Sequence, residues 1–195
     1  MRALLREGTA ARHQRLDVSF EGMTDADDAR QFHRFIRMNH ACHACLEPLV
    51  EALADRLGAP FLAERKPLLG ALASDMQSMG LAPVDAGSFS LDAADLPGAA
   101  GLIYVLDGSR LGARFIHREF IRKDLARRWP GASAAYLVGA SGSDAFGDRM
   151  AALSDRVESQ KARDRALAAA QAAFALFEAA HEATARHAHA EPVTS

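Results

Sequence analysis

A histidine near the start of the chain, His13, has neighbours that suit binding to a metal-bearing ligand. It lies on the apolar face of a predicted helix, which carries residues at i, i+4, i+8 and i+11: Leu5, Thr9, His13 and Leu16. Asp17 follows one turn later, where its carboxylate can accept a hydrogen bond from the imidazole N–H. The other ring nitrogen is then available to a metal ion. A core histidine beside a carboxylate is the alternative interpretation of these residues.

Two glycines, Gly108 and Gly112, lie four residues apart within an otherwise helical segment, residues 103–116. A glycine inside a helix costs roughly 0.5–1 kcal/mol relative to alanine, so two on one face need an explanation. Without a Cβ, that face lets a flat ligand or a second backbone approach closely. A glycine-lined helix opposite a helix that offers one imidazole favours a haem held between the two.

A haem carries two anionic propionates, and a chain of net charge −2 must supply local cations to seat them. Arg6 lies two turns before His13 on nearly the same face, roughly 10 Å away at 1.5 Å per residue. That separation resembles the distance from a haem iron to its propionates. We therefore expect Arg6 to pair with one propionate and Arg149, from a later helix, to supply a second cation.

The elements that must position these residues are helices. The chain has 195 residues, of which 49% are hydrophobic and only 7% aromatic, and strand signals are nearly absent. This length suits one domain that buries its own core. The sequence predicts an all-α, single-domain helical bundle over residues 1–187, with the haem between the first helix and a later distal helix. A flexible C-terminal tail is expected at 188–195.

The helix boundaries can be placed from capping and breaking residues. Thr24 is expected to cap the second helix, which Pro48 would bend or break and Gly58 would end. The helix dipole favours the acidic side chains in its first turn: Asp25, Asp27 and Asp28. Other helices are predicted at 2–17, 61–79, 98–128, 143–158 and 162–187, with a connecting loop at 80–97 and a helix or turn at 134–139.

Charge and hydropathy exclude several classes of protein. The net charge of −2 argues against a dedicated nucleic-acid binder. No apolar run reaches the length of a membrane span, and the first residues lack the continuous apolar core of a signal peptide. We therefore expect a cytoplasmic protein that binds neither nucleic acid nor membrane.

Cys42 and Cys45 lie in the segment His40-Ala-Cys-His-Ala-Cys45, where they could be taken for metal ligands. On a continuous helix these side chains point in different directions, so only some of them could converge on one ion. Covalent haem attachment would need a histidine directly after the second cysteine, and Leu46 stands there. Cys42 also fits the apolar stripe of its helix, so we interpret it as a buried thiol.

Arginines recur every four residues along the glycine-bearing segment: Arg110, Arg114, Arg118 and Arg122, followed by Lys123, Arg127 and Arg128. The simplest interpretation is a solvated helix face. Two functional alternatives are a docking surface for an acidic electron donor and a cation near the haem edge.

The combined features resemble those of bacterial, biliverdin-producing haem oxygenases, over most of the chain up to Phe177. The resemblance rests on the stretch from Thr9 to Asp17 (TAARHQRLD) and the stretch from Tyr104 to Gly112 (YVLDGSRLG), with a weaker echo in residues 174–178 (FALFE). It implies that His13 is the axial iron ligand and that Gly108 and Gly112 belong to a kinked distal helix over the oxygen site.

The resemblance also assigns roles to other residues. Arg6 falls where the family places a cation for a propionate, and Tyr104 would line the distal pocket. Mammalian members carry an aspartate directly after the first distal glycine, and this chain has Ser109 there. Ser109 is therefore expected at the oxygen site with the two glycines, and Asp107 would point away from the pocket.

The implied activity is oxidative cleavage of haem b, which is substrate and cofactor, to biliverdin, carbon monoxide and free iron. It consumes O2 and electrons from a separate ferredoxin or reductase, because the chain has no flavin or iron–sulfur motif. A biliverdin-binding photoreceptor is one conceivable receiver of the product. Two alternatives remain, a haem carrier or sensor on the same fold and a thiaminase-like enzyme with Cys42 or Cys45 as nucleophile.

Overall fold

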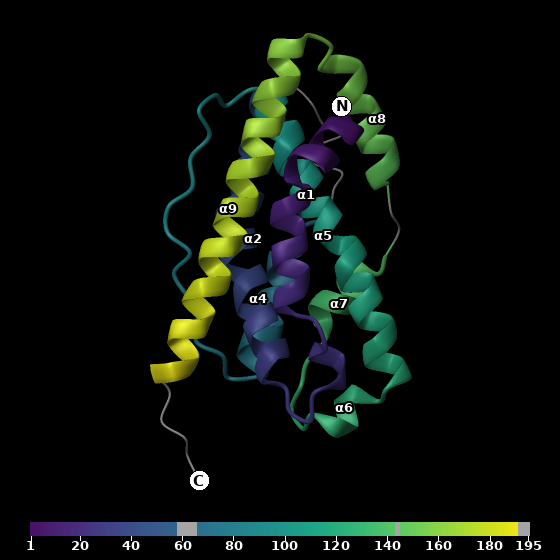
Figure 1. Cartoon of the computed structure of the whole chain (residues 1–195), viewed down its shortest axis with the longest axis vertical. Helices are drawn as coiled ribbons and strands as arrows, with labels where there is room; N and C mark the ends of the chain where they lie inside the picture. Colours follow the sequence, from purple (N-terminus) through teal and green to yellow (C-terminus); the bar gives the residue numbers. More distant parts are fainter. Residues whose placement is uncertain (58–65, 143–144, 191–195) are drawn as a thin grey trace.

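The structure is a computed structural model that describes residues 1–57, 66–142 and 145–190. Within those ranges every regular element is a helix (Figure 1), which confirms the all-α prediction. In chain order the elements are α1 (Arg2–Ser19), the 3-10 turn η1 (Met23–Asp25), α2 (Arg30–Arg56), α4 (Leu69–Ser78), α5 (Leu96–Arg122), α6 (Leu125–Arg128), α7 (Ala135–Ala140), α8 (Phe146–Arg156) and α9 (Gln160–Ala190). No helix among the described residues combines the length and apolarity needed to cross a membrane.

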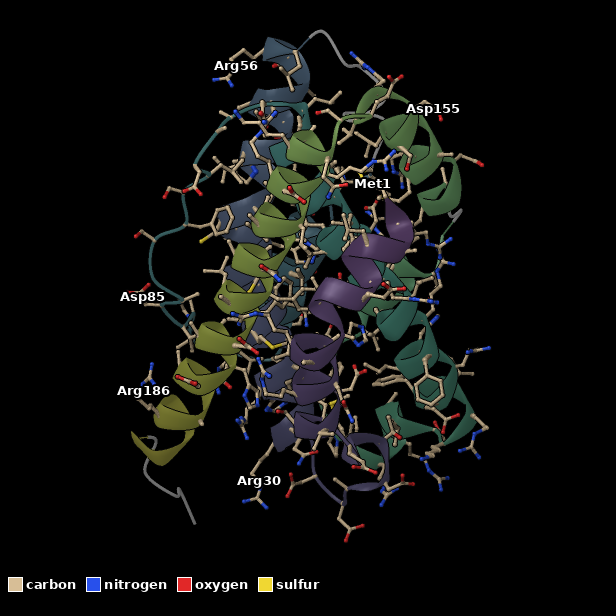
Figure 2. All side chains as sticks on the ribbon, turned by 45° about the horizontal axis from the view of Figure 1, so that its top comes forward. Met1, Arg30, Arg56, Asp85, Asp155 and Arg186 are labelled. Carbon is tan, nitrogen blue, oxygen red and sulfur yellow. The ribbon has the colours of Figure 1, made fainter. Side chains whose placement is uncertain are left out.

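The long helix α9 is the element around which the bundle is organised. It packs along α5, α1 and α2, and α1 lies beside both α5 and α9 in the two views (Figures 1 and 2). Glycines permit the close approaches. A Cβ on Gly8 of α1 would overlap the side chain of Leu167, and a Cβ on Gly101 of α5 would overlap the backbone of Ala166. Both helices therefore seat tightly on α9.

Two buried carboxylates join helices by capping them. The Asp75 side chain on α4 accepts hydrogen bonds from the backbone N–H groups of Ala135 and Tyr136, each at 2.8 Å, and so caps α7. Glu47 on α2 accepts from the N–H groups of Leu68 and Leu69, at 2.9 and 3.0 Å, and so caps α4. Each carboxylate satisfies backbone donors that would otherwise be lost at a helix start.

The start of α2 differs from the sequence prediction. Thr24 does not cap α2, which begins at Arg30 after Ala29, because residues 23–25 form η1 instead. Thr24 Oγ1 accepts a hydrogen bond from Lys123 Nζ at 3.0 Å. The nearby acidic side chains also pair with basic side chains that lie far along the chain, with sequence separations of 98 and 101: Asp25 with Lys123, and Asp27 with Arg128. Ion pairs with distant bases thus replaced the expected interaction with a helix dipole.

Most other boundaries agree with the sequence to within a few residues. Helix α2 continues through Pro48 without a break, and α5 is one helix through both glycines, followed after Lys123 by Asp124 at φ 50° and the short α6. Residues 80–95 form the expected connection. The start of the helix predicted at 61–79 and the expected end of α2 at Gly58 lie outside the described residues. Helix α9 extends to Ala190, and residues 191–195 of the predicted tail also lie outside the description.

Candidate functional site

His13 lies in the C-terminal half of α1 with 58% of its side chain exposed. Its Nδ1 is 2.8 Å from Oδ2 of Asp17, so the structure brings together the two side chains that the spacing pairs. Thr9 and Leu5, one and two turns earlier on the same face, are buried. The apolar stripe of α1 therefore ends in the bundle core at its N-terminal side, and His13 emerges from it toward the surface with one nitrogen engaged by Asp17.

Helix α1 is held on α9 by polar contacts on either side of His13. The Glu178 carboxylate accepts hydrogen bonds from Arg12 and from Arg15, with Arg15 Nη2 at 2.7 Å from Oε1. Gln171 Nε2 donates to the Gly8 carbonyl at 2.9 Å. The imidazole itself meets the edge of the Phe174 ring, with centroids 5.9 Å apart. These contacts fix the rotation of α1 about its axis and, with it, the direction of the His13 side chain.

One side of α5 is left uncovered around the two glycines. A Cβ added to Gly108 or to Gly112 would meet no heavy atom of the described residues within 4 Å outside its own stretch of helix. Two apolar side chains share this side at helical spacing, with 44% of Leu111 and 57% of Phe115 exposed. We call Gly108, Leu111, Gly112 and Phe115 the glycine face. It is apolar and open, in contrast to Gly101, where α9 fills the corresponding space.

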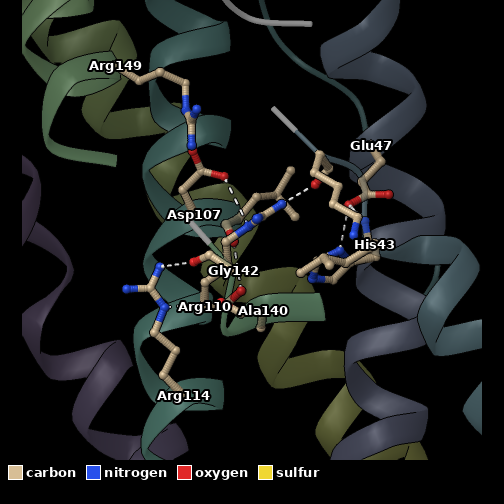
Figure 3. A network of polar contacts seen from close by, with 12 residues as sticks. His43, Glu47, Asp107, Arg110, Arg114, Ala140, Gly142 and Arg149 are labelled. Carbon is tan, nitrogen blue, oxygen red and sulfur yellow. Dashed lines mark hydrogen bonds and ion pairs between the residues drawn. The ribbon is translucent and has the colours of Figure 1, made fainter. Parts of the chain in front are cut away.

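Another side of α5 is braced by charged side chains (Figure 3). Asp107 is fully buried, and its Oδ2 accepts a hydrogen bond from Arg149 Nε on α8 at 2.8 Å. Arg110 pairs with the other oxygen at 3.6 Å and donates to the Lys66 carbonyl. Arg114 donates to the carbonyl oxygens of Ala140 and Gly142, at 3.1 and 3.3 Å. Asp107 is thus directed into a contact with α8.

The interpretation of the arginine row as a solvated face is therefore wrong for its first half. Arg110 is only 6% exposed and Arg114 is half-buried, because both serve as donors between elements. The second half fits the prediction better. Arg118 is exposed over the Phe115 ring, and Arg122 forms an exposed pair with Glu119, whose pKa its hydrogen bond lowers to about 2.

The remaining residues predicted at the site have these positions. Tyr104 is half-buried against Phe146 of α8, with ring centroids 6.2 Å apart, and the guanidinium of Arg2 lies over Phe146. The Ser109 hydroxyl donates to the Leu106 carbonyl at 2.8 Å. Arg6 is exposed on α1. Arg6 belongs to α1, and Tyr104 and Ser109 belong to α5. These are the two helices expected to enclose the ligand.

Arg149 is the one predicted site residue to which the structure gives a different partner. We expected it to supply a cation for a propionate, but its side chain is 11% exposed and its Nε is bound to Asp107. The sequence offered no sign of this pairing, since the two residues are 42 positions apart on different helices. A buried ion pair of this kind is broken only at considerable cost.

The cysteines have the character of structural thiols. Cys42 is fully buried, and burial and the nearby Cys45 raise its pKa well above the ordinary value, which confirms the interpretation as a buried thiol. Burial and the neighbouring Asp85 raise the pKa of Cys45 as well. In the part of the chain that the structure describes, no three His, Cys, Asp or Glu side chains gather around a possible metal ion. A raised pKa is the opposite of the lowered pKa that activates a nucleophilic thiol.

Sequence reasoning missed the residues that hold the site in place. Glu178 was noted only as part of a weak motif, although it binds two arginines of α1. An acid that directly follows an apolar run, residues 172–177, was the available signal. Asp107 carried a similar signal, because it directly follows the apolar run from Leu102 to Leu106.

Comparison with known proteins gives one informative relative. No protein-family model matches the chain. The chain is 34% identical over 163 residues to a protein of Xanthomonas campestris pv. campestris (strain 8004) that is named heme oxygenase. The aligned region covers 82% of this chain and 93% of that protein, so the similarity is not confined to one motif.

Proposed function

The chain belongs to the haem oxygenase family, and on that premise we propose that it cleaves haem b oxidatively to biliverdin, carbon monoxide and free iron. The single observation that carries the proposal is the pairing of two features on neighbouring helices. An exposed imidazole is oriented by a carboxylate on α1, and an open, apolar glycine face lies on α5. A flat, largely apolar ring with one axial position for nitrogen matches both.

His13 is the proposed axial ligand. A haem-binding histidine needs one nitrogen free for iron and benefits from a hydrogen bond at the other, which fixes the ring and raises its basicity. The Asp17 contact at Nδ1 meets the second requirement and leaves Nε2 for the iron. The clamp of Glu178 on Arg12 and Arg15 holds α1 in the orientation that presents the imidazole.

The glycine face is the proposed distal surface. Because Gly108 and Gly112 lack a Cβ, the backbone of α5 can approach the ring closely and leave room for a small diatomic ligand. The Ser109 hydroxyl donates its one hydrogen bond to the Leu106 carbonyl, so its oxygen can only accept further hydrogen bonds. Asp107 is directed to Arg149 and offers no proton at this face.

When bound, haem supplies both the iron that activates O2 and the carbon skeleton that is oxidised. The protein's contribution is to hold the ring and to keep strong acids away from the distal side, so that the ring itself is attacked. We propose Arg6 as the cation for one propionate, because it is exposed on the same helix as His13. Electrons would come from a ferredoxin or reductase in the cytoplasm, and a photoreceptor could receive the biliverdin.

Of the two alternatives, the haem carrier or sensor uses the same residues and differs only in turnover. The thiaminase-like alternative requires an accessible thiol of lowered pKa, and both cysteines have a raised one. We therefore retain only the carrier as a rival.

Haem titration followed by reduction in air tests the proposal. We expect a one-to-one complex with a histidine-ligated spectrum, which ascorbate or a ferredoxin system converts to a biliverdin spectrum, with the product identified by chromatography. A complex that persists unchanged under these conditions would favour the carrier. Failure to bind haem at all would remove both.

A further inference from the structure

Asp107 and Arg149 form a buried ion pair beside the glycine face. Asp107 is the residue before Gly108, and both charged side chains are largely withdrawn from solvent, at 0% and 11% exposure for Asp107 and Arg149. Replacing a buried ion pair by apolar side chains is often neutral or even stabilising, so stability alone is a poor explanation for this one. Its position at the glycines of α5 points to a different explanation.

The same part of α5 is intrinsically weak. Gly108 and Gly112 lower the helix propensity of this turn, and no packing against the described residues compensates on the glycine face. On another side of α5, charged side chains of the helix contact neighbouring elements at three successive places. Asp107 contacts Arg149, Arg110 contacts the Lys66 carbonyl, and Arg114 contacts the carbonyl of Ala140 (Figure 3).

Arg149 is the brace that comes from α8. It lies one turn after Phe146, which packs on Tyr104 of α5, so two adjacent turns of α8 contact α5 on either side of Leu106. Moving α8 or releasing Arg149 would free the turn that contains Gly108. A displacement there of even a fraction of an ångström would alter the distance between the helix backbone and a ring lying on it.

We propose that the Asp107–Arg149 pair is a positioning element that fixes the height of the glycine face over the haem and thereby governs the rate of ring cleavage. The inference rests on the proposed function. It assigns both residues an effect through the backbone of Gly108 and Gly112, without contact to the propionates. Arg149 therefore controls turnover and leaves haem affinity largely unchanged.

The test compares R149M with R165M, which removes an ion pair of similar length at a distance from the glycine face. Arg165 lies on α9, and its Nε is 2.9 Å from Oδ2 of Asp95, the residue that precedes α5. Hydrogen exchange is measured on the haem-free proteins, and haem Kd and the cleavage rate on the loaded ones. In R149M we expect exchange of amides 105–115 to rise by about tenfold with α9 unchanged. We expect its kcat to fall by about tenfold and its haem Kd to change by less than about threefold.

Several results would overturn the proposal. Unchanged exchange at 105–115, or an equal increase throughout the protein, would show that the pair does not brace this segment in particular. A large rise in haem Kd with normal kcat would place Arg149 at a propionate instead. R165M should match the wild type in exchange at 105–115 and in kcat, and an equal loss there would mean that any broken pair has this effect.

Two further measurements keep the test decisive. If R149M does not fold, R149K and D107N are used, since both retain a hydrogen-bonding group at the site. At least one of the two variants should raise exchange at 105–115, and wild-type exchange in both would overturn the proposal. If the wild-type protein binds haem but does not cleave it, the proposed function fails, while the exchange result still decides whether the pair braces the glycine face.

Discussion

His13 Nδ1 and Asp17 Oδ2 lie 2.8 Å apart on α1, with both side chains more than half exposed. An exposed pair at i, i+4 on a helix adds only about 0.3–0.5 kcal/mol to stability. The contact therefore does little for the fold, and its main effect is on the imidazole, which it orients while leaving Nε2 for a ligand. The predictions below follow from this pair and from the open face of α5.

Replacing His13 should remove the axial bond without unfolding the helix. Because the side chain is 58% exposed, His13→Ala is expected to keep the helix content of the wild type. Its reduced haem complex should lack the iron–histidine band in resonance Raman spectra, and added imidazole should restore a nitrogen-ligated spectrum. His40→Ala on α2 is the control and should keep the band. An unchanged band in His13→Ala would contradict the assignment.

Gly112 is expected to lower the stability of the haem-free protein while leaving space for the ligand. Gly112→Ala adds a methyl group to open space, so the haem-free protein should gain about 0.5–1 kcal/mol in its free energy of unfolding. Gly101→Ala is the matched control, and it should lose stability because its Cβ would lie 2.8 Å from that of Ala169. Urea unfolding measures both.

A larger side chain at the same position tests function. Gly112→Leu should slow or stop biliverdin formation while helix content stays near that of the wild type, because the added atoms occupy the space needed by the ring and oxygen. Absorbance measures biliverdin formation, and circular dichroism measures helix content. Full turnover in Gly112→Leu would mean that this face has no part in the reaction.

Removing the cation of Arg6 should weaken haem binding modestly. A charge-assisted hydrogen bond contributes roughly 1.5–3 kcal/mol, and less where the propionate edge is solvated, so Arg6→Ala should raise the haem Kd by about tenfold. The ring should also rotate more freely in its plane and change the mixture of biliverdin isomers. Arg186→Ala, an exposed cation at the far end of α9, should do neither. If Kd and isomers both match the wild type, Arg6 does not seat the haem.

Acid should destabilise the protein through His181. Burial, followed by the nearby Arg34, lowers the pKa of His181 below its ordinary value of 6.5, and Arg34 donates to its Nε2 at 3.0 Å. The unfolded chain therefore takes up the proton first as the pH falls. The contribution of neutral His181 is complete above pH 6.5 and is lost as the pH falls from there through the lowered folded value.

His181→Gln should reduce this dependence, because glutamine can accept from Arg34 but does not titrate. Free energies of unfolding at pH 7.5 and pH 5 would show a smaller difference in the variant than in the wild type. The difference should not vanish, since burial also lowers the pKa of His40. An identical pH dependence in both proteins would show that His181 does not titrate differently on folding.

Much of the fold was readable from the sequence because its signals are local. The apolar stripe of α2 and the glycine spacing of α5 each act within a few residues. The partners of buried charges were not readable. Asp107 finds Arg149, and Glu47 caps the start of α4, through contacts that depend on how the helices pack.

Thr24 illustrates the same limit. Its residue type is typical of a helix cap, and acidic residues follow it in the sequence. Lys123 and Arg128, about a hundred residues later, pair with those acids and the chain forms η1 instead. For the site, the pairing of His13 with Asp17 was predictable from spacing alone. The burial of Arg110 and the ion pair of Arg149 with Asp107 were not.

The most direct test of the central claim is the amount of carbon monoxide released per haem. The purified haem complex is reduced under oxygen in a sealed vessel, and carbon monoxide is captured on deoxymyoglobin and counted against the haem lost. If His13 and the glycine face direct attack on the ring, one carbon monoxide should appear for each haem consumed, and His13→Ala should release little. Loss of haem without carbon monoxide, or a haem complex that survives reduction in air, would contradict the account.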